Sequence, residues 1–304
     1  GACMGACPFG AISDKSFIVD VIRALKDKKN VYAVVAPSIT GQFGSNVTVG
    51  QVKAAFKKMG FKDMIEAACG ADAVAVHEGN EFIERMEKGD KYMTNSCCSG
   101  FLNYIEKKFP DQIERVSGTV SPMIAAGRMV KSMDKDSVVV FVGPCTAKKN
   151  EIKRDSIKDA VDYVMTFEEI TALMGAFGID AEECEAIATD DASIFGRGFA
   201  QGGGVIAAIQ NYMKSKDTEI EFKPVRASGS AEIKRTMIMA KVGRLSGNFI
   251  EGMMCEGGCI GGPAAMVPIM KSRSQLLRFS KESTKKDVVD NENLKKYDGL
   301  NLER

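Results

Sequence analysis

The stretch Met253–Pro263, with the sequence MMCEGGCIGGP, decides the fold and points to the chemistry. Two cysteines stand four residues apart in it, with a glycine pair between them and a second pair just beyond. Glycine serves where the backbone approaches another group closely or adopts positive φ, and cysteines in such a setting usually hold a soft metal or carry out redox chemistry. A buried strand is expected at 248–250 and the start of a helix at 264–270. The stretch is therefore expected to be a strand-to-helix turn that presents two thiolates.

Two further turns of the same kind lie earlier in the chain. Asn95–Gly100 (NSCCSG) contains Cys97 and Cys98, and Gly143–Glu151 (GPCTAKKNE) places Cys145 directly after an apolar run. Each of the three turns follows an expected strand and precedes an expected helix. Ligands of parallel sheets gather outside the carboxyl ends of the strands, and the N-termini of the following helices favour anions. The sequence therefore predicts that three separate crossovers bring thiolates to one rim.

Strands alternate with helices along the chain, which is typical of parallel sheets. The expected strands are 31–36, 91–94, 137–142, 161–165 and 248–250. The expected helices are 20–28, 49–59, 78–88, 99–109, 122–133, 167–177, 205–214 and 230–241. We expect an α/β fold of two lobes, each a small, twisted, mainly parallel sheet flanked by helices, with the active-site cluster in the cleft between them. Lobe one is expected at about 19–143, lobe two at about 144–270, and a C-terminal helical tail at 271–304.

The composition is that of an ordinary globular protein, with 304 residues, 45% apolar and 27% charged. A net charge of +1 gives no reason to expect nucleic-acid binding, and no apolar run approaches the ~20 residues that span a bilayer. Nine cysteines in so long a chain do not form a secreted disulfide scaffold. We expect a cytoplasmic protein, in which Cys69 and Cys184 are buried structural thiols in helical contexts.

The first residues, Gly1–Ile12 (GACMGACPFGAI), carry a separate cysteine pattern. Cys3 and Cys7, followed by Pro8, match the last third of the bacterial ferredoxin run C-x2-C-x2-C-x3-C-P. Residues 1–18 are therefore expected to be the remnant of a ferredoxin-like domain, whose accessory 4Fe–4S clusters belong to a missing N-terminal region.

Four thiolates from three turns satisfy a 4Fe–4S cube. They are Cys98, Cys145, Cys255 and Cys259. Structural zinc is the competing interpretation, but it usually takes closely spaced cysteine pairs on short hairpins, and the single histidine, His77, has no ligand-spaced partner and is expected to be a surface or packing residue. Cys97 and Cys98 are adjacent, so their side chains diverge and one thiol is left beside the cluster. The spare thiol is either inert packing or a proton donor and acceptor.

The three cysteine turns resemble the three signatures of FeFe-hydrogenases, in that family's order and at similar separations. The matching stretches are Ser96–Cys98, Pro144–Glu151 and Met253–Cys259. Ala36–Ser38 resembles the family's cyanide-facing loop, and Phe199–Val205 resembles its glycine-rich pocket loop. The resemblance extends from about Lys28 to Gly262.

The resemblance implies the H-cluster, a 4Fe–4S cube joined through one cysteine to a diiron unit with CO, CN⁻ and a bridging dithiolate amine. By position Cys259 would be the bridging cysteine, and the other three ligands would complete the cube. The residues expected around the diiron unit are Pro37, Ser38, Lys148, Met253 and Phe199. Lys148 offers a point charge and Ser38 a hydrogen-bond donor to the buried anions, whereas Met253 and Phe199 form apolar walls.

The implied reaction is reversible, 2H⁺ + 2e⁻ ⇌ H₂. The implied partners are a ferredoxin-type electron carrier and the maturases that build the diiron unit. Protons would pass from Cys97 through Glu78, Ser117, Glu81 and Arg85 to solvent. Three-residue and four-residue spacings put Glu78, Glu81 and Arg85 on one helix face, as a relay requires.

Four positions depart from the commonest members of the family. Ser99 and Glu256 each stand in place of a proline, Phe101 in place of a tryptophan, and Gly143 in place of a methionine. Such changes beside the ligands tune the potential of a metal site rather than its composition. We therefore expect a divergent subgroup, in which an ionised Glu256 lowers the cluster potential.

Three other functions are compatible with parts of the sequence. The first is a slow-turnover hydrogen sensor that keeps the same site. The second is a non-enzymatic iron–sulfur assembly protein of hydrogenase-like fold, which needs the cube but not Cys97, Lys148 or Met253. The third is a nucleotide enzyme, because the glycines of 196–202 nearly match a dinucleotide fingerprint; their spacing is wrong and no clean strand precedes them.

Overall fold

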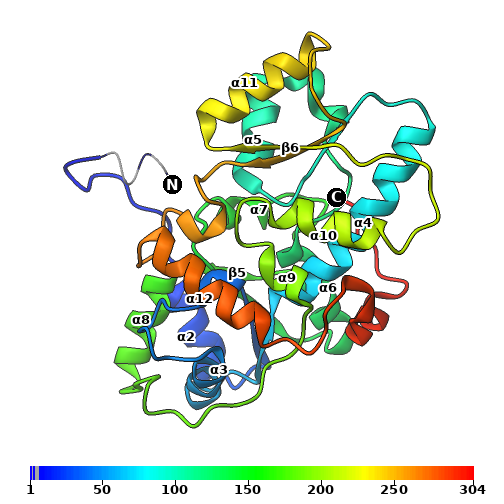
Figure 1. Ribbon diagram of the computed structural model, residues 1–304. Helices are drawn as coiled ribbons and strands as arrows, with labels where there is room; N and C mark the ends of the chain where they lie inside the picture. The colour runs from blue at the N-terminus through cyan, green and yellow to red at the C-terminus, as the bar shows by residue number, and fades with distance from the viewer. Residues whose placement is uncertain (2, 4–6) are drawn as a thin grey trace.

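The computed structural model describes residues 1, 3 and 7–304, which form two lobes built on two parallel sheets (Figure 1). Sheet one has the strand order β2-β1-β4-β5, and sheet two has the order β3-β7-β6. The strands of sheet one are β1 Val31–Val35, β2 Asp63–Glu66, β4 Val138–Val142 and β5 Tyr163–Met165. The strands of sheet two are β3 Met93–Thr94, β6 Pro224–Ser228 and β7 Phe249–Met253. All pairings are parallel, so the predicted α/β class is confirmed.

The centre of sheet one is formed by the two most apolar runs of the chain. β1 (VYAVV) and β4 (VVVFV) pair over their full lengths, from Val31 opposite Val138 to Val35 opposite Val142. Most of their side chains are buried, as expected for strands covered by helices on both faces.

The boundary predicted near Pro144 is wrong for the sheets. β3 lies before it but pairs with β7 in sheet two, where Met93 is opposite Phe249. β5 lies after it but extends sheet one, where Val164 is opposite Phe141. Parallel strands need long crossover connections, and the chain uses these connections to pass between the lobes more than once. Each lobe therefore consists of separate stretches of sequence.

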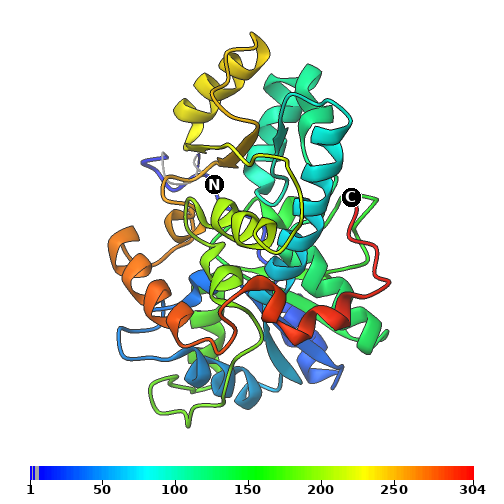
Figure 2. The same ribbon diagram turned by 45° about the vertical axis from the view of Figure 1, so that its right-hand side comes forward.

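Helices cover both sheets, and Figures 1 and 2 show α11 and α5 at the end of sheet two and α2, α3 and α8 at the opposite end of the molecule. The α-helices are α2 Ile18–Lys26, α3 Val49–Lys58, α4 Ala67–Glu87, α5 Ser99–Lys108, α6 Pro122–Met133, α7 Lys148–Glu151, α8 Phe167–Ala176, α9 Ile194–Gly198, α10 Gly204–Met213, α11 Ser230–Lys241 and α12 Ile269–Lys281. The 3₁₀ helices are η1 Pro37–Ile39, η2 Pro110–Arg115, η3 Cys259–Gly261, η4 Val288–Asp290 and η5 Glu292–Tyr297.

Local signals explain the helix starts that the sequence predicted well. Thr48 and Thr166 cap α3 and α8 through complete capping boxes with Gln51 and Glu169. Pro122 occupies the first turn of α6, where its missing N–H costs nothing.

Three predicted elements differ in the structure. α4 begins at Ala67 rather than near residue 78. The sequence did not indicate this earlier start, because the first half of the helix is a run of small residues without a clear apolar stripe. No helix begins at residue 264; η3 begins within the cysteine turn at Cys259, and α12 begins only at Ile269, after Pro268. The tail beyond α12 forms two 3₁₀ helices.

α4 is the helix that connects the core to the surface. It packs against α6, α9 and α10, and most of its first half is buried. None of the helices in the described part of the chain is both long enough and apolar enough to cross a membrane.

Candidate metal centre

Three turns at the carboxyl ends of β3, β4 and β7 carry the cysteines, although β7 is the last strand of the described residues and its turn is not the predicted crossover. Cys98 is the N-cap of α5 after β3, Cys145 lies between β4 and α7, and Cys255 follows β7. The backbone N–H of Met254, next to Cys255, donates to Sγ of Cys98 at 3.5 Å. Because β4 belongs to sheet one and β3 and β7 to sheet two, the thiols come from both lobes.

The four expected ligands lie close enough to influence one another electrostatically. Burial, assisted by the neighbouring thiols, raises the pKa of Cys145 and Cys259 and raises that of Cys255 to about 12. In every pair drawn from these three residues and Cys98, the charge of one sulfur raises the pKa of another. The thiols therefore converge, and they need a cation to become thiolates.

Over residues 1, 3 and 7–304, no group of three or more Cys, His, Asp or Glu side chains is placed to hold a metal ion. A four-iron cube binds one thiolate at each of four irons, so its ligands stand farther apart than those of one ion. The convergence of the four thiols is compatible with a cluster of that size.

An apolar cavity of about 70 Å³ lies beside these cysteines. Since about 10–15 Å³ accommodates one water molecule, it has room for a small ligand. Its lining includes the predicted residues Pro37, Cys97, Cys98, Lys148, Phe199, Met253 and Cys259. The structure thus brings together, around one cavity, residues that are far apart in the sequence.

Cys97 is the spare thiol, and it is buried at this cavity. Burial is the largest effect on its pKa and raises it well above the ordinary value, so that the thiol stays protonated at neutral pH. Nδ2 of Asn95 donates to Sγ of Cys97 at 3.2 Å, and Oδ1 of Asn95 accepts from the N–H of Gly252 at 2.8 Å. Asn95 therefore orients the thiol and ties it to β7.

Lys148 carries a buried positive charge at the cavity. Burial alone would lower its pKa, but Glu151, 2.6 Å away, and Cys145 raise it, so the ammonium persists. Nζ also donates to the carbonyl of Cys97 at 3.2 Å. Glu151 further accepts from Ser121 at 2.6 Å and from Ser99. Lys148 is thus a buried cation, fixed by Glu151 and the Cys97 carbonyl, rather than the solvent-exposed lysine that its polarity alone would suggest.

Ser38 supplies an observation that tests the fit of an anionic ligand. Its side chain is completely buried in η1, next to Pro37 of the cavity lining, and its Oγ has no hydrogen-bond partner among residues 1, 3 and 7–304. An unpaired buried hydroxyl costs free energy, and an acceptor bound nearby would satisfy it. A cavity with a free hydroxyl beside it, a lysine cation at its wall and thiols at its edge fits an anionic, sulfur-ligated metal group.

Glycines allow the cluster turn to meet the pocket loop. Gly258 has φ +88°, and a Cβ placed there would lie 2.6 Å from the backbone N of Gly202. The two loops are hydrogen-bonded, because the N–H of Gly202 donates to Gly257 at 2.9 Å and that of Ile260 donates to Ala200 at 3.0 Å. The position of Phe199 is therefore coupled to that of Cys259.

We predict that Gly258→Ala lowers the iron content of the purified protein and destabilises it by at least about 2 kcal/mol, because the backbone conformation is essentially restricted to glycine and a backbone atom blocks the methyl group. Iron per chain and thermal unfolding measure the effect. Gly175→Ala is the matched control: Gly175 lies in α8 with nothing within 4 Å of its added Cβ. Unchanged iron content in Gly258→Ala would contradict the prediction.

The predicted relay residues fall into two groups, Glu78 with the backbone of Ser96 next to Cys97, and Ser117 with Glu81 and Arg85. The N–H of Ser96 donates to Oε1 of Glu78 at 3.2 Å, and Oε2 of Glu78 has no hydrogen-bond partner in the part of the chain that the structure describes. Oγ of Ser117 donates to Oε2 of Glu81 at 2.5 Å, and Nη2 of Arg85 lies 2.7 Å from Oε1 of Glu81. The path leads from a fully buried carboxyl to partly exposed side chains.

Burial and the nearby charge of Glu81 raise the pKa of Glu78 to about 8, although Ser117 and the Ser96 N–H partly oppose them. Glu78 is therefore protonated at neutral pH. Glu81 behaves differently: burial alone would raise its pKa, but hydrogen bonds from Gly118 and Ser117 and the charge of Arg85 lower it overall. At neutral pH, Glu78 can therefore donate a proton and Glu81 can accept one.

Glu78→Gln should flatten the dependence of stability on pH. Because folding raises the pKa of Glu78, its stabilising contribution is complete below the unfolded pKa near 4.5 and is lost as the pH rises through about 8. The unfolding free energy of the wild type should fall by about 4 kcal/mol more than that of Glu78→Gln between pH 5 and pH 9. Denaturant titrations at both pH values measure this, with Glu84→Gln, an exposed carboxylate, as control. Parallel curves for wild type and Glu78→Gln would contradict it.

Sequence reasoning missed several residues that hold the site. Asn95 and Glu151 lie inside the quoted motifs, and the three-residue spacing of Lys148 and Glu151 could have suggested their pairing. The pairing of Glu66 with Arg197 could not be predicted from a local sequence pattern, because the two residues lie 131 positions apart.

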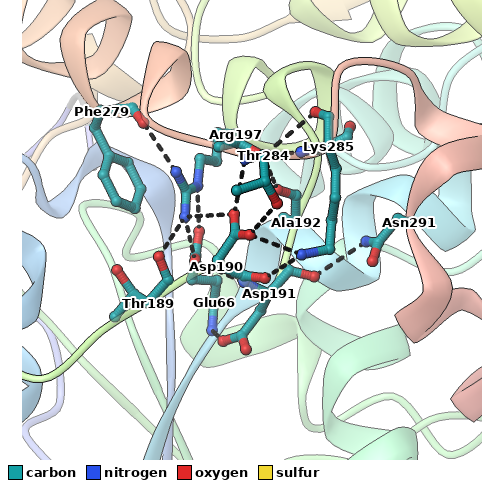
Figure 3. A network of polar contacts seen from close by, with 12 residues as sticks. Glu66, Thr189, Asp190, Asp191, Ala192, Arg197, Phe279, Thr284, Lys285 and Asn291 are labelled. Atoms are coloured by element: carbon teal, nitrogen blue, oxygen red, sulfur yellow. Dashed lines mark hydrogen bonds and ion pairs between the residues drawn. The ribbon is translucent and has the colours of Figure 1, made fainter.

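Figure 3 shows the network around Arg197, a fully buried arginine of α9. Its Nε and Nη2 each donate to Glu66 at 2.7 Å, a bidentate pair at the end of β2. It also donates to the carbonyls of Phe279 and Thr189 at 2.9 Å, and its guanidinium stacks 3.8 Å from the Phe279 ring centroid. This clamp joins sheet one, α12 and the loop that carries Phe199.

The four departures from the family pattern have local partners. Ser99 donates to Glu151, the ring of Phe101 packs against Gly252, and Gly143 leaves room for Phe141. Glu256 is exposed and its side chain lies against Gly229, next to Cys255.

The predicted ferredoxin-like remnant lies partly outside the described residues, at positions 2 and 4–6. Of its cysteines, Cys3 is exposed and Cys7 partly exposed. Asp14 pairs with the buried Lys149 at 2.5 Å, and the carbonyl of Lys15 accepts from it at 2.9 Å. Cys69 lies in α4 as expected, whereas Cys184 is buried in a turn rather than in a helix.

Comparison with known proteins decides the family. Residues 29–263 match the model of the iron-only hydrogenase large subunit, C-terminal domain. The chain belongs to the iron-only hydrogenase family. The matched range covers the three cysteine turns, so the resemblance noted in the sequence is confirmed.

Relatives within the iron-only hydrogenase family are distant and of two kinds. The NADP-reducing hydrogenase subunit HndD of Solidesulfovibrio fructosivorans is 28% identical over 91% of this chain and 58% of its own length. Iron hydrogenase 1 of Clostridium pasteurianum is 28% identical over 84% of this chain and 53% of its length. The cytosolic Fe-S cluster assembly factor NAR1 of Meyerozyma guilliermondii is 27% identical over 51% of this chain and 34% of its length. The chain thus spans a little over half the length of the two hydrogenases.

Solved iron-only hydrogenases share the fold. The FeFe-hydrogenase HydA(deltaEFG) matches with a TM-score of 0.79 at 20% identity, covering 94% of this chain and 95% of that one. Apo FeFe-hydrogenase HydA1 from Chlamydomonas reinhardtii matches with a TM-score of 0.78 at 20% identity, with the same coverage. These likenesses confirm the architecture.

Proposed function

We propose that this chain is the catalytic domain of an FeFe-hydrogenase that interconverts protons, electrons and H₂ through a ferredoxin-type carrier. The observation that supports this best is the spare thiol: Cys97 lines the same cavity as Cys98, Cys259 and Lys148, and the N–H of its neighbour Ser96 donates to a buried carboxyl, Glu78. A protein that only carried an iron–sulfur cube would not need that thiol or the carboxyl behind it.

The residues present fit the H-cluster. Cys98, Cys145, Cys255 and Cys259 would hold the cube, and Lys148 and Ser38 would face the anionic ligands of the diiron unit. Met253 and Phe199, which are buried at the cavity, exclude water from it, and Pro37 orders the turn that carries Ser38. When bound, the diiron unit supplies the electron transfer and a basic nitrogen.

The chain's own contribution is to hold and move protons. Cys97 keeps its proton at neutral pH because it is buried, and Asn95 orients its Sγ. Glu78, also protonated, resupplies Cys97, and Ser117 connects Glu78 to the ionised Glu81. A relay of matched groups of this kind raises proton-transfer rates by about 10²–10⁴.

Two other functions remain distinguishable. A hydrogen sensor would keep this site but turn over slowly. An iron–sulfur assembly factor is favoured by the NAR1 relatives and disfavoured by Cys97, Lys148 and the relay. The cytoplasmic location stays a prediction, since relatives include both a cytosolic assembly factor and a periplasmic hydrogenase. The accessory clusters, the electron carrier and the maturases also stay predictions.

Isotope exchange between D₂ and water tests the proposal on protein matured with the diiron cofactor. Mass spectrometry should detect HD at a rate comparable to hydrogen production with a reduced ferredoxin. HD formation with negligible net turnover would favour the sensor, and no HD from fully matured protein would refute both hydrogen functions.

A further inference from the structure

The outer end of the relay is set by the hydrogen bonds of Glu81. Oε2 accepts from Ser117 at 2.5 Å and from Thr119 at 3.0 Å. Oε1 accepts from the N–H of Gly118 at 2.8 Å and faces Nη2 of Arg85 at 2.7 Å. A carboxylate offers about four acceptor positions. All four positions of Glu81 are therefore occupied by protein donors.

Three of these donors cannot carry a proton from solvent. Ser117 is completely buried and belongs to the inner side of the path. The N–H of Gly118 is a backbone amide. Arg85 is a guanidinium, which does not lose its proton in proteins, and it is anchored by the carbonyls of Glu114 at 2.7 Å and Val116 at 3.2 Å. Its role is to keep Glu81 ionised.

Thr119 is the remaining donor, and its hydroxyl is in contact with a titratable side chain. Nδ1 of His77 lies 2.9 Å from Oγ1 of Thr119. Because the hydroxyl hydrogen of Thr119 is directed to Glu81, Nδ1 of His77 must carry the hydrogen of this contact. His77 is partly exposed and lines a surface cavity of about 450 Å³. Histidine is the side chain whose charge ordinarily changes between pH 5 and 8.

We propose that Thr119 and His77 form the solvent end of the proton path, so that protons reach Glu81 through the imidazole rather than through Arg85. The inference rests on the proposed hydrogenase function and goes beyond the relay predicted from the sequence. In the inward direction, His77 takes a proton from water at Nε2 and gives its Nδ1 proton to Oγ1 of Thr119. The hydroxyl proton of Thr119 passes to Oε2 of Glu81, so that one proton enters and one moves inward.

The surroundings of His77 suit this exchange. The charged groups that line the same cavity are Glu81, Glu84, Arg85 and Lys88 from α4 and Glu303 from the C-terminal segment. Glu84 and Lys88 pair with each other at 3.3 Å, and Arg85 is committed to Glu81. Thr119 is held in place by an isolated backbone bridge to Glu303. The imidazole thus contacts Thr119, which leads to the carboxylate of Glu81, on one side, and it borders the surface cavity on the other.

The tautomer of His77 tests the geometry directly. His77 is the single histidine of the chain, so ¹⁵N NMR of the purified protein observes one imidazole. The neutral ring should carry its hydrogen on Nδ1 in the wild type and in Thr119→Ser. Thr119→Val, which keeps the shape but removes the hydroxyl, should lose that preference. A hydrogen on Nε2 in the wild type would overturn the proposal.

Turnover against pH tests the role. His77→Gln should lower hydrogen production about three- to tenfold in dilute buffer and flatten the profile between pH 5 and 8, less than the loss of an internal relay group; added imidazole should restore part of the rate. Glu84→Gln, which changes the charge of the same cavity, should keep the wild-type profile. An active wild type whose His77→Gln variant keeps that profile would refute this inference alone. A matured wild type without turnover would refute the proposed function and this inference with it.

Discussion

Cys97→Ala is expected to lower hydrogen turnover by about 10²- to 10⁴-fold while leaving the metal site assembled. The thiol is buried at the cavity and is oriented by Asn95, and in the proposed path it is the last protein group before the diiron unit. It is not among the four expected ligands. Removing it should therefore interrupt proton delivery and leave the infrared bands of the cofactor in place.

The control for this variant is Cys184→Ala, which removes a buried thiol that does not line the cavity. It should retain turnover close to that of the wild type. Cys97→Ser provides a second comparison, because a hydroxyl fills the same space but is a much weaker acid. Undiminished turnover in Cys97→Ala with intact bands would remove the thiol from the mechanism.

Arg197→Met is expected to destabilise the protein by about 3–5 kcal/mol, because it leaves the carboxylate of Glu66 buried without its partner. Both side chains of this pair are almost completely buried, and burial raises the pKa of Glu66 in spite of Arg197. At roughly 2–4 °C per kcal/mol for large domains, the midpoint of thermal unfolding should fall by about 6–20 °C. The iron content should also fall, since Arg197 holds the segment that leads to Phe199.

A double variant separates the two causes of this loss. Arg197→Met combined with Glu66→Leu removes both charges, and buried ion pairs replaced by apolar groups often lose little stability. The double variant should therefore be more stable than Arg197→Met alone. Arg278→Met, at an exposed position of α12, should change stability by less than about 0.5 kcal/mol. A single variant as stable as the wild type would show that the clamp does not hold the fold.

The four expected ligands could be proposed from the sequence because their signals are local. Each of the three cysteine turns is a short strand–turn–helix unit, and a parallel sheet brings the ends of such units to one edge. The central strands were equally readable, since β1 and β4 are unbroken apolar runs. Neighbouring residues likewise indicate two helix starts: Pro122 marks the first turn of α6, and Thr48 caps α3.

The features that the sequence did not disclose depend on contacts between distant segments. β2 and β6 are short and partly exposed, so neither has a clear apolar pattern. The division into lobes depends on which strands pair, and Met93 meets Phe249 only after the chain has crossed between the sheets. His77 looked like an isolated surface residue because its partner, Thr119, lies 42 residues away.

The expectation for Lys148 illustrates the same limit. The motif indicated a buried cation for an anionic ligand, and the lysine does line the cavity. Its own counter-ion, Glu151, and the two serines that bind this carboxylate became visible only in the structure. A charge that is held in this way needs no ligand to stay buried, which explains how the site can be preformed.

Infrared spectroscopy of the matured protein tests the central claim most directly, because the diiron unit of the H-cluster carries CO and CN⁻ ligands and a 4Fe–4S cube does not. The account predicts sharp CO and CN⁻ stretching bands in the wild type, their retention in Cys97→Ala and their loss in Cys259→Ala. A wild type that binds a 4Fe–4S cube but shows no such bands, under conditions that mature a known FeFe-hydrogenase, would contradict the account and favour an iron–sulfur assembly protein.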